Sequence, residues 1–134
     1  MTVIDHRLHG HCVACGPENP SGLRLKFEKQ SDGSVKAAAF CVKDLSGYDG
    51  LLHGGVAALM LDSAMTNCLF SAGITALTAE MNVKYRAPVQ IGRAVILRAS
   101  VKADHDPLFT VSSELRQDGR QKVSAEAKFM RTVG

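Results

Sequence analysis

Residues 53–66 read HGGVAALMLDSAMT, and this stretch predicts the element around which the rest of the chain is arranged. Nearly every residue after the glycine pair is a good helix former or is small and apolar. A run that is apolar on most faces predicts a helix that is buried on most of its circumference. We expect the helix to run from about Gly54 to Ser71, with Gly73 as its C-terminal stop.

One acidic residue interrupts this apolar run. Asp62 lies in the middle of the predicted helix, between apolar neighbours. An unpaired buried carboxylate costs several kcal/mol, so this side chain needs a partner or a chemical role. It could act as a general base toward water or as a nucleophile, and the sequence does not separate the two. The structural alternative is a carboxylate that bonds to Ser63 or Thr66.

The start of the helix is also unusual, because two glycines occupy its first turn. Glycine lets another group approach the backbone closely, and the first N–H groups of a helix have no intrahelical partner. They suit an anion, or a carbonyl oxygen that becomes anionic during a reaction. We therefore expect a backbone N–H of Gly54 or Gly55 to be the oxyanion donor. His53 is expected to cap the helix or line the site, not to act as a base.

An oxyanion donor and an acid on one helix together indicate acyl transfer. Gly54 and Asp62 are eight residues apart, which is about 12 Å along a helix. One carbonyl group cannot touch both, so two antiparallel copies of the helix would have to share each site. We therefore expect a homodimer with the site at its interface, and a tetramer as its further assembly.

Alternating apolar and polar residues predict the strands. The Asp118-Gly119 pair is a two-residue hairpin signal between the last two strands. Six antiparallel strands curled around one long helix would cover its apolar faces, which is an α+β architecture. The expected strands are Leu23–Glu28, Val35–Val42, Ile74–Arg86, Ala94–Asp104, Leu108–Gln117 and Gln121–Thr132.

A second motif follows the helix. Residues 78–88 read TAEMNVKYRAP, and Gly92 follows. Together with His-Gly-Gly and an acid eight residues after the first glycine, this pattern resembles the hotdog-fold acyl-CoA thioesterases of the 4-hydroxybenzoyl-CoA thioesterase superfamily. The similarity extends to its phenylacetic-acid-degradation-like group and covers residues 20–133. It implies hydrolysis of an acyl-CoA to a free acid and coenzyme A, with no metal or organic cofactor.

The resemblance selects Gly54 as the oxyanion donor, with Gly55 beside it in the substrate site, and it also assigns a helper to the acid. Thr78 matches a Ser/Thr that approaches the catalytic acid and the water in similar thioesterases, although an ordinary strand residue is the alternative. Glu80 should share its face by strand alternation and is a rival carboxylate. Some relatives have a polar residue six positions before the His. Here that position is Gly47, and Ser46 or Tyr48 are the candidates to replace it.

Basic residues are candidates for binding the phosphates of coenzyme A. Arg86, next to Ala87-Pro88 at the end of a strand, is the first choice, although a solvated strand position is the alternative for each of them. The other candidates are Lys84, Arg93, Lys102 and Lys122.

Length and composition limit the class of protein. The 134 residues, 46% of them hydrophobic, predict a single domain over 1–134 with a lead-in over 1–21. A net charge of +3 argues against a nucleic-acid-binding protein and is compatible with an anionic ligand. No run reaches the ~18 apolar residues of a membrane helix, and the first residues do not form a signal peptide. We expect a cytoplasmic protein with reduced cysteines.

The lead-in contains a Cys-x-x-Cys motif flanked by histidines. Cys12, Cys15, His9 and His11 could supply four ligands to Zn²⁺, but an eight-residue window would be cramped. We favour small thiols that pack a turn, and therefore no metal, although the sequence leaves the metal alternative open.

Two rival functions remain. A dehydratase or hydratase of the same fold would use a His with an Asp, and the predicted helix contains no His. A non-catalytic acyl-CoA-binding module would keep the pocket but would not need Asp62.

Overall fold

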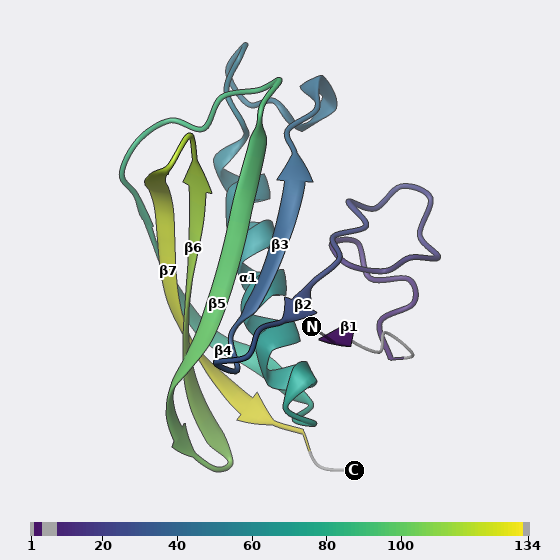
Figure 1. Ribbon diagram of the computed structural model, residues 1–134, viewed down its shortest axis with the longest axis vertical. Coiled ribbons are helices and arrows are strands. Elements are labelled where there is room, and N and C mark those ends of the chain that lie inside the picture. Colours follow the sequence, from purple (N-terminus) through teal and green to yellow (C-terminus); the bar gives the residue numbers. More distant parts are fainter. Residues whose placement is uncertain (1, 4–7, 133–134) are drawn as a thin grey trace.

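The computed structural model describes residues 2–3 and 8–132 (Figure 1). These residues form one sheet and one long helix, with a short 3₁₀ helix at Lys43–Leu45. The long helix is α1 (Gly54–Ser71). The strands are β1 (Thr2–Val3), β2 (Glu28–Lys29), β3 (Val35–Phe40), β4 (Ala76–Tyr85), β5 (Ala94–His105), β6 (Leu108–Gln117) and β7 (Arg120–Arg131).

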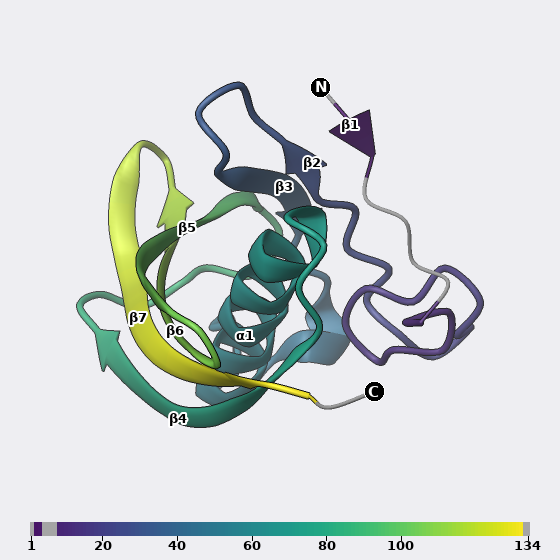
Figure 2. The same cartoon turned by 90° about the horizontal axis from the view of Figure 1, so that it is seen from below.

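The sheet is antiparallel throughout and has the strand order β1-β2-β3-β5-β6-β7-β4. Seen along the helix, the sheet curls around α1 from β3 through β7 to β4 (Figure 2). This arrangement confirms the predicted hotdog architecture of six strands, β2 to β7, around one helix. The two-residue β1 adds a seventh strand at one edge.

The core lies between α1 and the inner face of the sheet. Alternate residues of β6 are buried, as expected for a strand with one face on a core. Burial of each large apolar side chain contributes about 1.5–3 kcal/mol, so these contacts hold the helix in the sheet. The largest fully buried apolar side chains are Phe27, Phe109, Phe129, Met60, Leu61, Met65, Leu69, Leu97 and Leu115.

The predicted helix boundaries are confirmed. His53 is the N-cap, and α1 runs from Gly54 to Ser71. Gly73 follows with φ +79°, the left-handed conformation that ends many helices. Within the described residues, no helix is both long enough and apolar enough to cross a bilayer.

The prediction of a strand over Leu23–Glu28 is mostly wrong, because most of this segment is not a strand. Its alternating burial is as expected, but only Glu28 belongs to β2. Arg24 has φ +53°, which interrupts an extended strand. The Leu23 and Leu25 N–H groups instead donate to carbonyls of the lead-in loop, so this segment pairs with the loop and not with the sheet.

A bulge in β4 corrects the expected orientation of Glu80. Thr78 pairs with Phe129, whereas Glu80 pairs with Lys128, so Ala79 is the extra residue. Phe129 is buried and Lys128 is exposed. Thr78 therefore lies on the inner face and Glu80 on the outer face, and the prediction that they share a face is wrong.

The lead-in predicted over residues 1–21 is partly described, because residues 1 and 4–7 lie outside the described residues, as do 133–134 at the other end. Thr2–Val3 form a strand, not a loop. From residue 8 onward the lead-in is a loop on the side of α1 that the sheet leaves open (Figure 2). The ring of His9 packs against that of Phe70, with 5.1 Å between the centroids.

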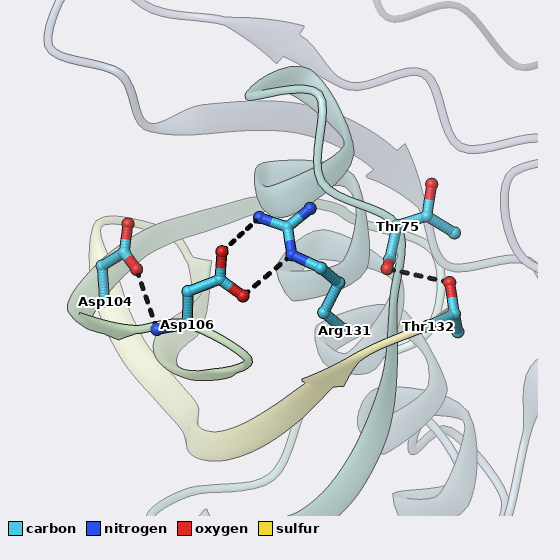
Figure 3. A network of polar contacts seen from close by, with 5 residues as sticks. All are labelled: Thr75, Asp104, Asp106, Arg131 and Thr132. Atoms are coloured by element: carbon cyan, nitrogen blue, oxygen red, sulfur yellow. Dashed lines mark hydrogen bonds and ion pairs between the residues drawn. The ribbon is translucent and has the colours of Figure 1, made fainter. Parts of the chain in front are cut away.

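A polar network joins the turn between β5 and β6 to the end of β7 (Figure 3). Both carboxylate oxygens of Asp106 accept from the Arg131 guanidinium, at 2.9 and 3.0 Å. These bonds hold the pKa of Asp106 below its usual value. The Thr132 hydroxyl donates to the Thr75 carbonyl at 3.1 Å, which joins β7 to the start of β4.

Candidate active site

The first half of the candidate site is a pair formed by α1 and β4. The Thr78 hydroxyl donates to Asp62 Oδ1 at 2.6 Å. Asp62 is half-buried and Thr78 is exposed, so the carboxylate is open to a ligand in the isolated chain. The bulge at Ala79 turns Thr78 toward the helix. The pair brings together an acid and a hydroxyl that the sequence placed 16 residues apart.

The second half is the N-terminus of α1. His53 Nδ1 accepts a hydrogen bond from the Gly55 N–H at 2.8 Å. The ring lies so close that a Cβ on Gly55 would be 3.1 Å from it, which explains the glycine at this position. His53 thus pairs with the Gly55 N–H, whereas the Gly54 N–H has no acceptor within the described residues. An unpaired N–H at the positive end of a helix suits a developing oxyanion.

Tyr85 is a site residue that the sequence reasoning missed. Its hydroxyl donates to the Gly54 carbonyl at 2.7 Å. A Cβ on Gly54 would lie 3.5 Å from the Tyr85 ring, which is ordinary van der Waals contact. The signal was available, because strand alternation after the bulge places Tyr85 on the same inner face as Met81 and Val83. Tyr85 thus fixes the helix start against the end of β4.

The loop before the helix contains Gly47 and the two residues that are candidates to replace its missing polar side chain. A Cβ on Gly47 would lie 3.2 Å from the His53 Cα, so the loop packs tightly here. The Ser46 hydroxyl donates to the Lys43 carbonyl at 2.6 Å, and Tyr48 is 84% exposed. Within the described residues, neither hydroxyl forms a hydrogen bond to Asp62 or Thr78 of the same chain.

Arg86 lies apart from both halves. It lines a polar groove of about 900 Å³ along the outer face of the sheet, together with Lys84, Lys102 and Glu80. Arg93 instead forms an ion pair with Asp118 at 2.7 Å. The structure therefore does not bring Arg86 together with Asp62, although it follows Tyr85 at the end of β4.

A separate cluster lies in the lead-in loop. Donor atoms of His9, Cys12 and Cys15 are all within 4.8 Å of one another, whereas His11 Nδ1 lies 3.6 Å from Glu18 and outside the cluster. Burial raises the pKa of the Cys15 thiol to about 11. Burial acts to raise the pKa of Cys12 as well, but backbone N–H groups, first that of Cys15, bring it below its usual value.

Comparison with known proteins agrees with this architecture. A sequence model of the thioesterase superfamily matches residues 49–124. Acyl-coenzyme A thioesterase 13 of Mus musculus is 28% identical over 87 residues, which are 63% of this chain and 62% of that protein. A solved thioesterase superfamily protein has a TM-score of 0.86 at 27% identity, over 97% of this chain and 66% of that one.

A hypothetical thioesterase of Streptococcus pneumoniae, solved with coenzyme A, has the same fold. Its TM-score is 0.76 at 18% identity, over 81% of this chain and 88% of that one. The present chain spans 62% of the length of the mouse acyl-coenzyme A thioesterase 13, which is less than two thirds.

Proposed function

Because the chain belongs to the thioesterase superfamily, we propose that it hydrolyses an acyl-CoA thioester to the free acid and coenzyme A. The observation that carries the proposal is the hydrogen bond from Thr78 to Asp62. An acid that is oriented by a hydroxyl and open to a ligand can take a proton from water or attack a carbonyl carbon. The curated relative is named as an acyl-CoA thioesterase, and coenzyme A is the ligand of the streptococcal structure.

The proposed site combines residues of two subunits. The Gly54 N–H of one subunit donates to the thioester carbonyl oxygen, and Asp62 of the partner subunit supplies the base or nucleophile. Support comes from the spacing, because about 12 Å of helix separates the two residues in one chain. In the isolated chain both groups are accessible, and neither has the other within reach.

The edge strand β4 supports the pairing of two copies. It is the terminal strand of the sheet, and no described strand pairs with its free edge. Leu77 is 66% exposed and Tyr85 is 56% exposed on this strand. A long edge strand with apolar side chains is a template for pairing with another chain. We propose a homodimer through this edge, with a tetramer as the further assembly.

The chemistry can follow two routes from this geometry. As a base, Asp62 takes a proton from water, and the hydroxide attacks the carbonyl carbon to give a tetrahedral oxyanion at the Gly54 N–H. As a nucleophile, Asp62 attacks the carbon directly and forms a mixed anhydride, which water then hydrolyses. In both routes the carbon–sulfur bond breaks and coenzyme A leaves as a thiolate. Thr78 orients the acid in either case.

The remaining residues are assigned to substrate binding. His53 and Gly55 would line the thioester pocket at the helix start. Arg86 would bind a phosphate of coenzyme A from its position just beyond Tyr85, in the outer groove. No metal or organic cofactor enters these steps, and a cytoplasmic location remains an expectation.

The test is a hydrolysis screen over aryl- and alkyl-CoA substrates with two variants. Asp62→Asn should keep the fold and lower turnover by about 10²–10⁴-fold, because it removes the acid–base group. Glu80→Gln is the matched control, since this carboxylate lies on the opposite face of β4, and it should retain near-native turnover. A near-native rate for Asp62→Asn would show that the assignment is wrong.

Two other outcomes would replace the proposal. Tight binding of acyl-CoA by calorimetry, with no hydrolysis over the whole panel, would indicate a binding module. Conversion of an enoyl-CoA to a hydroxyacyl-CoA would indicate a hydratase. The absence of a His from α1 argues against the hydratase.

A further inference from the structure

The lead-in loop brings three metal-binding side chains together over the open side of α1. His9 packs on Phe70 of the helix. Cys15 is buried, and Asn67 and Ser63 of α1 lie close to its sulfur. Cys12 remains partly exposed. The cluster thus has a buried wall formed by the helix and an open side toward solvent.

The spacing of the donor atoms is close to that required by a tetrahedral ion. With Zn–S bonds of about 2.3 Å and Zn–N bonds of about 2.0 Å, two ligand atoms are separated by roughly 3.5–3.8 Å. His9 Nδ1 and Cys15 Sγ are 3.5 Å apart, and all three donor atoms lie within 4.8 Å of one another. An ion could therefore be bound with small rotations of the side chains.

The backbone around Cys12 is already folded to support a thiolate. The Cys15 N–H donates to Cys12 Sγ at 3.4 Å, and the Gly16 N–H donates to the Cys12 carbonyl at 2.9 Å. A Cβ on Gly16 would lie 2.3 Å from the Cys12 nitrogen, so only glycine allows this tight turn. An N–H directed at sulfur favours the charged ligand form.

Asn67, whose side chain lies near Cys15, has a buried polar atom that lacks a partner in the described part of the chain. Asn67 is 0% exposed, and its Oδ1 has no hydrogen bond within the described residues. Its Nδ2 donates to the Ser63 carbonyl at 2.8 Å, which fixes the orientation of the amide. Three protein ligands leave one coordination position open, and a metal-bound water beside Cys15 would supply the missing donor.

We propose that His9, Cys12 and Cys15 bind a soft divalent metal ion, for which Zn²⁺ is the best chemical match. Thiolate and imidazole ligands in a tetrahedral arrangement select this class of ion. This proposal differs from the expectation from the sequence, which favoured small thiols without a metal. The ion cross-links the lead-in loop where this loop covers α1, because all three protein ligands come from the loop itself. The proposal does not depend on the thioesterase activity.

The test is a titration of the reduced, metal-free full chain with Co²⁺. We expect a single cobalt ion per chain, sulfur-to-cobalt charge-transfer bands and the intense visible bands of a tetrahedral site, all displaced by Zn²⁺. His9→Gln and Cys12→Ser should lose these bands. His11→Gln and Cys41→Ser are the matched controls and should retain them, because neither residue belongs to the cluster.

The thermal midpoint provides a second readout. Zn²⁺ should raise the midpoint of the wild type and leave that of His9→Gln unchanged, since only a bound ion stabilises the fold. His9 is partly exposed, so this variant stays informative even if Cys12→Ser does not fold. Absence of thiolate bands at stoichiometric cobalt, or equal bands in His9→Gln, would overturn the proposal. So would a Cys12–Cys15 disulfide in a protein whose reduced form does not bind cobalt.

Discussion

The Thr78 hydroxyl and the Asp62 carboxylate are joined by a hydrogen bond of 2.6 Å between edge strand β4 and the middle of α1. A bond this short is typical of a hydroxyl that donates to a charged oxygen. Because Thr78 occupies Oδ1, it fixes the carboxylate and leaves Oδ2 for water or substrate. A second bond, from Tyr85 to the Gly54 carbonyl, fixes the other end of the same strand to the helix start.

Replacing Thr78 should affect turnover more than folding. Thr78→Val removes the hydroxyl but keeps a β-branched side chain of similar volume. Loss of a hydrogen bond to a charged group costs about 1.5–3 kcal/mol, so kcat/KM should fall by roughly 10–100-fold. Thr78→Ser should restore most of the rate, as measured with a preferred acyl-CoA. If Thr78→Val and Thr78→Ser were equally active, the hydroxyl would have no role in catalysis.

Much of the fold could be predicted because the sequence carries it locally. The apolar run after Gly54 and the positive φ of Gly73 set the ends of α1, and the hairpin at Asp118-Gly119 joins two strands whose ends lie within a residue of those expected. These features depend on near neighbours in the chain. The segment from Leu23 was misjudged because it hydrogen-bonds to the preceding lead-in loop and not to a strand, and alternation of apolar and polar residues does not reveal the partner.

The candidate site was predictable in its residue types but not in its geometry. The bulge at Ala79 places Thr78 and Glu80 on opposite faces of β4, and simple alternation cannot anticipate an extra residue. The different roles of Gly54 and Gly55 depend on the rotamer of His53, which places its ring over one N–H and not over the other.

Removal of one N–H should test the oxyanion role of Gly54. Proline is well tolerated at the first position of a helix, and His53, with φ −61° and ψ 132°, has the conformation that proline requires before it. Gly54→Pro should therefore fold and lower kcat by about 10²–10³-fold. Gly54→Ala keeps the N–H, and its methyl meets Tyr85 at an acceptable 3.5 Å. It should stay within a few-fold of wild type, and equal losses in both variants would point to steric blockage instead.

The Asp106–Arg131 pair should make the thermal stability of the fold depend on pH in the acidic range. Arg131 lowers the pKa of Asp106, so the charged pair stabilises the fold above the unfolded carboxyl pKa of about 3.9. This contribution is lost as the pH falls through the lower folded pKa. The thermal midpoint of Asp106→Asn should lie slightly below that of wild type at neutral pH and converge with it in acid. Asp118→Asn, which removes the single contact between Arg93 and Asp118 on the surface, is the control. If the thermal midpoints of wild type and Asp106→Asn differed by the same amount at every pH, the prediction would be contradicted.

Mixing two inactive variants should reveal whether the site is shared between subunits. An Asp62→Asn chain retains its Gly54 N–H, and a Gly54→Pro chain retains its Asp62. If each site takes one group from each subunit, a heterodimer contains one intact and one doubly defective site. Refolding the two chains together at equal amounts should then restore about a quarter of the wild-type rate, because about half of randomly formed dimers are heterodimers with one working site. If both groups of a site came from one chain, every site in the mixture would carry one defect. The activity would then remain at the level of the separate variants, and the shared site would be excluded.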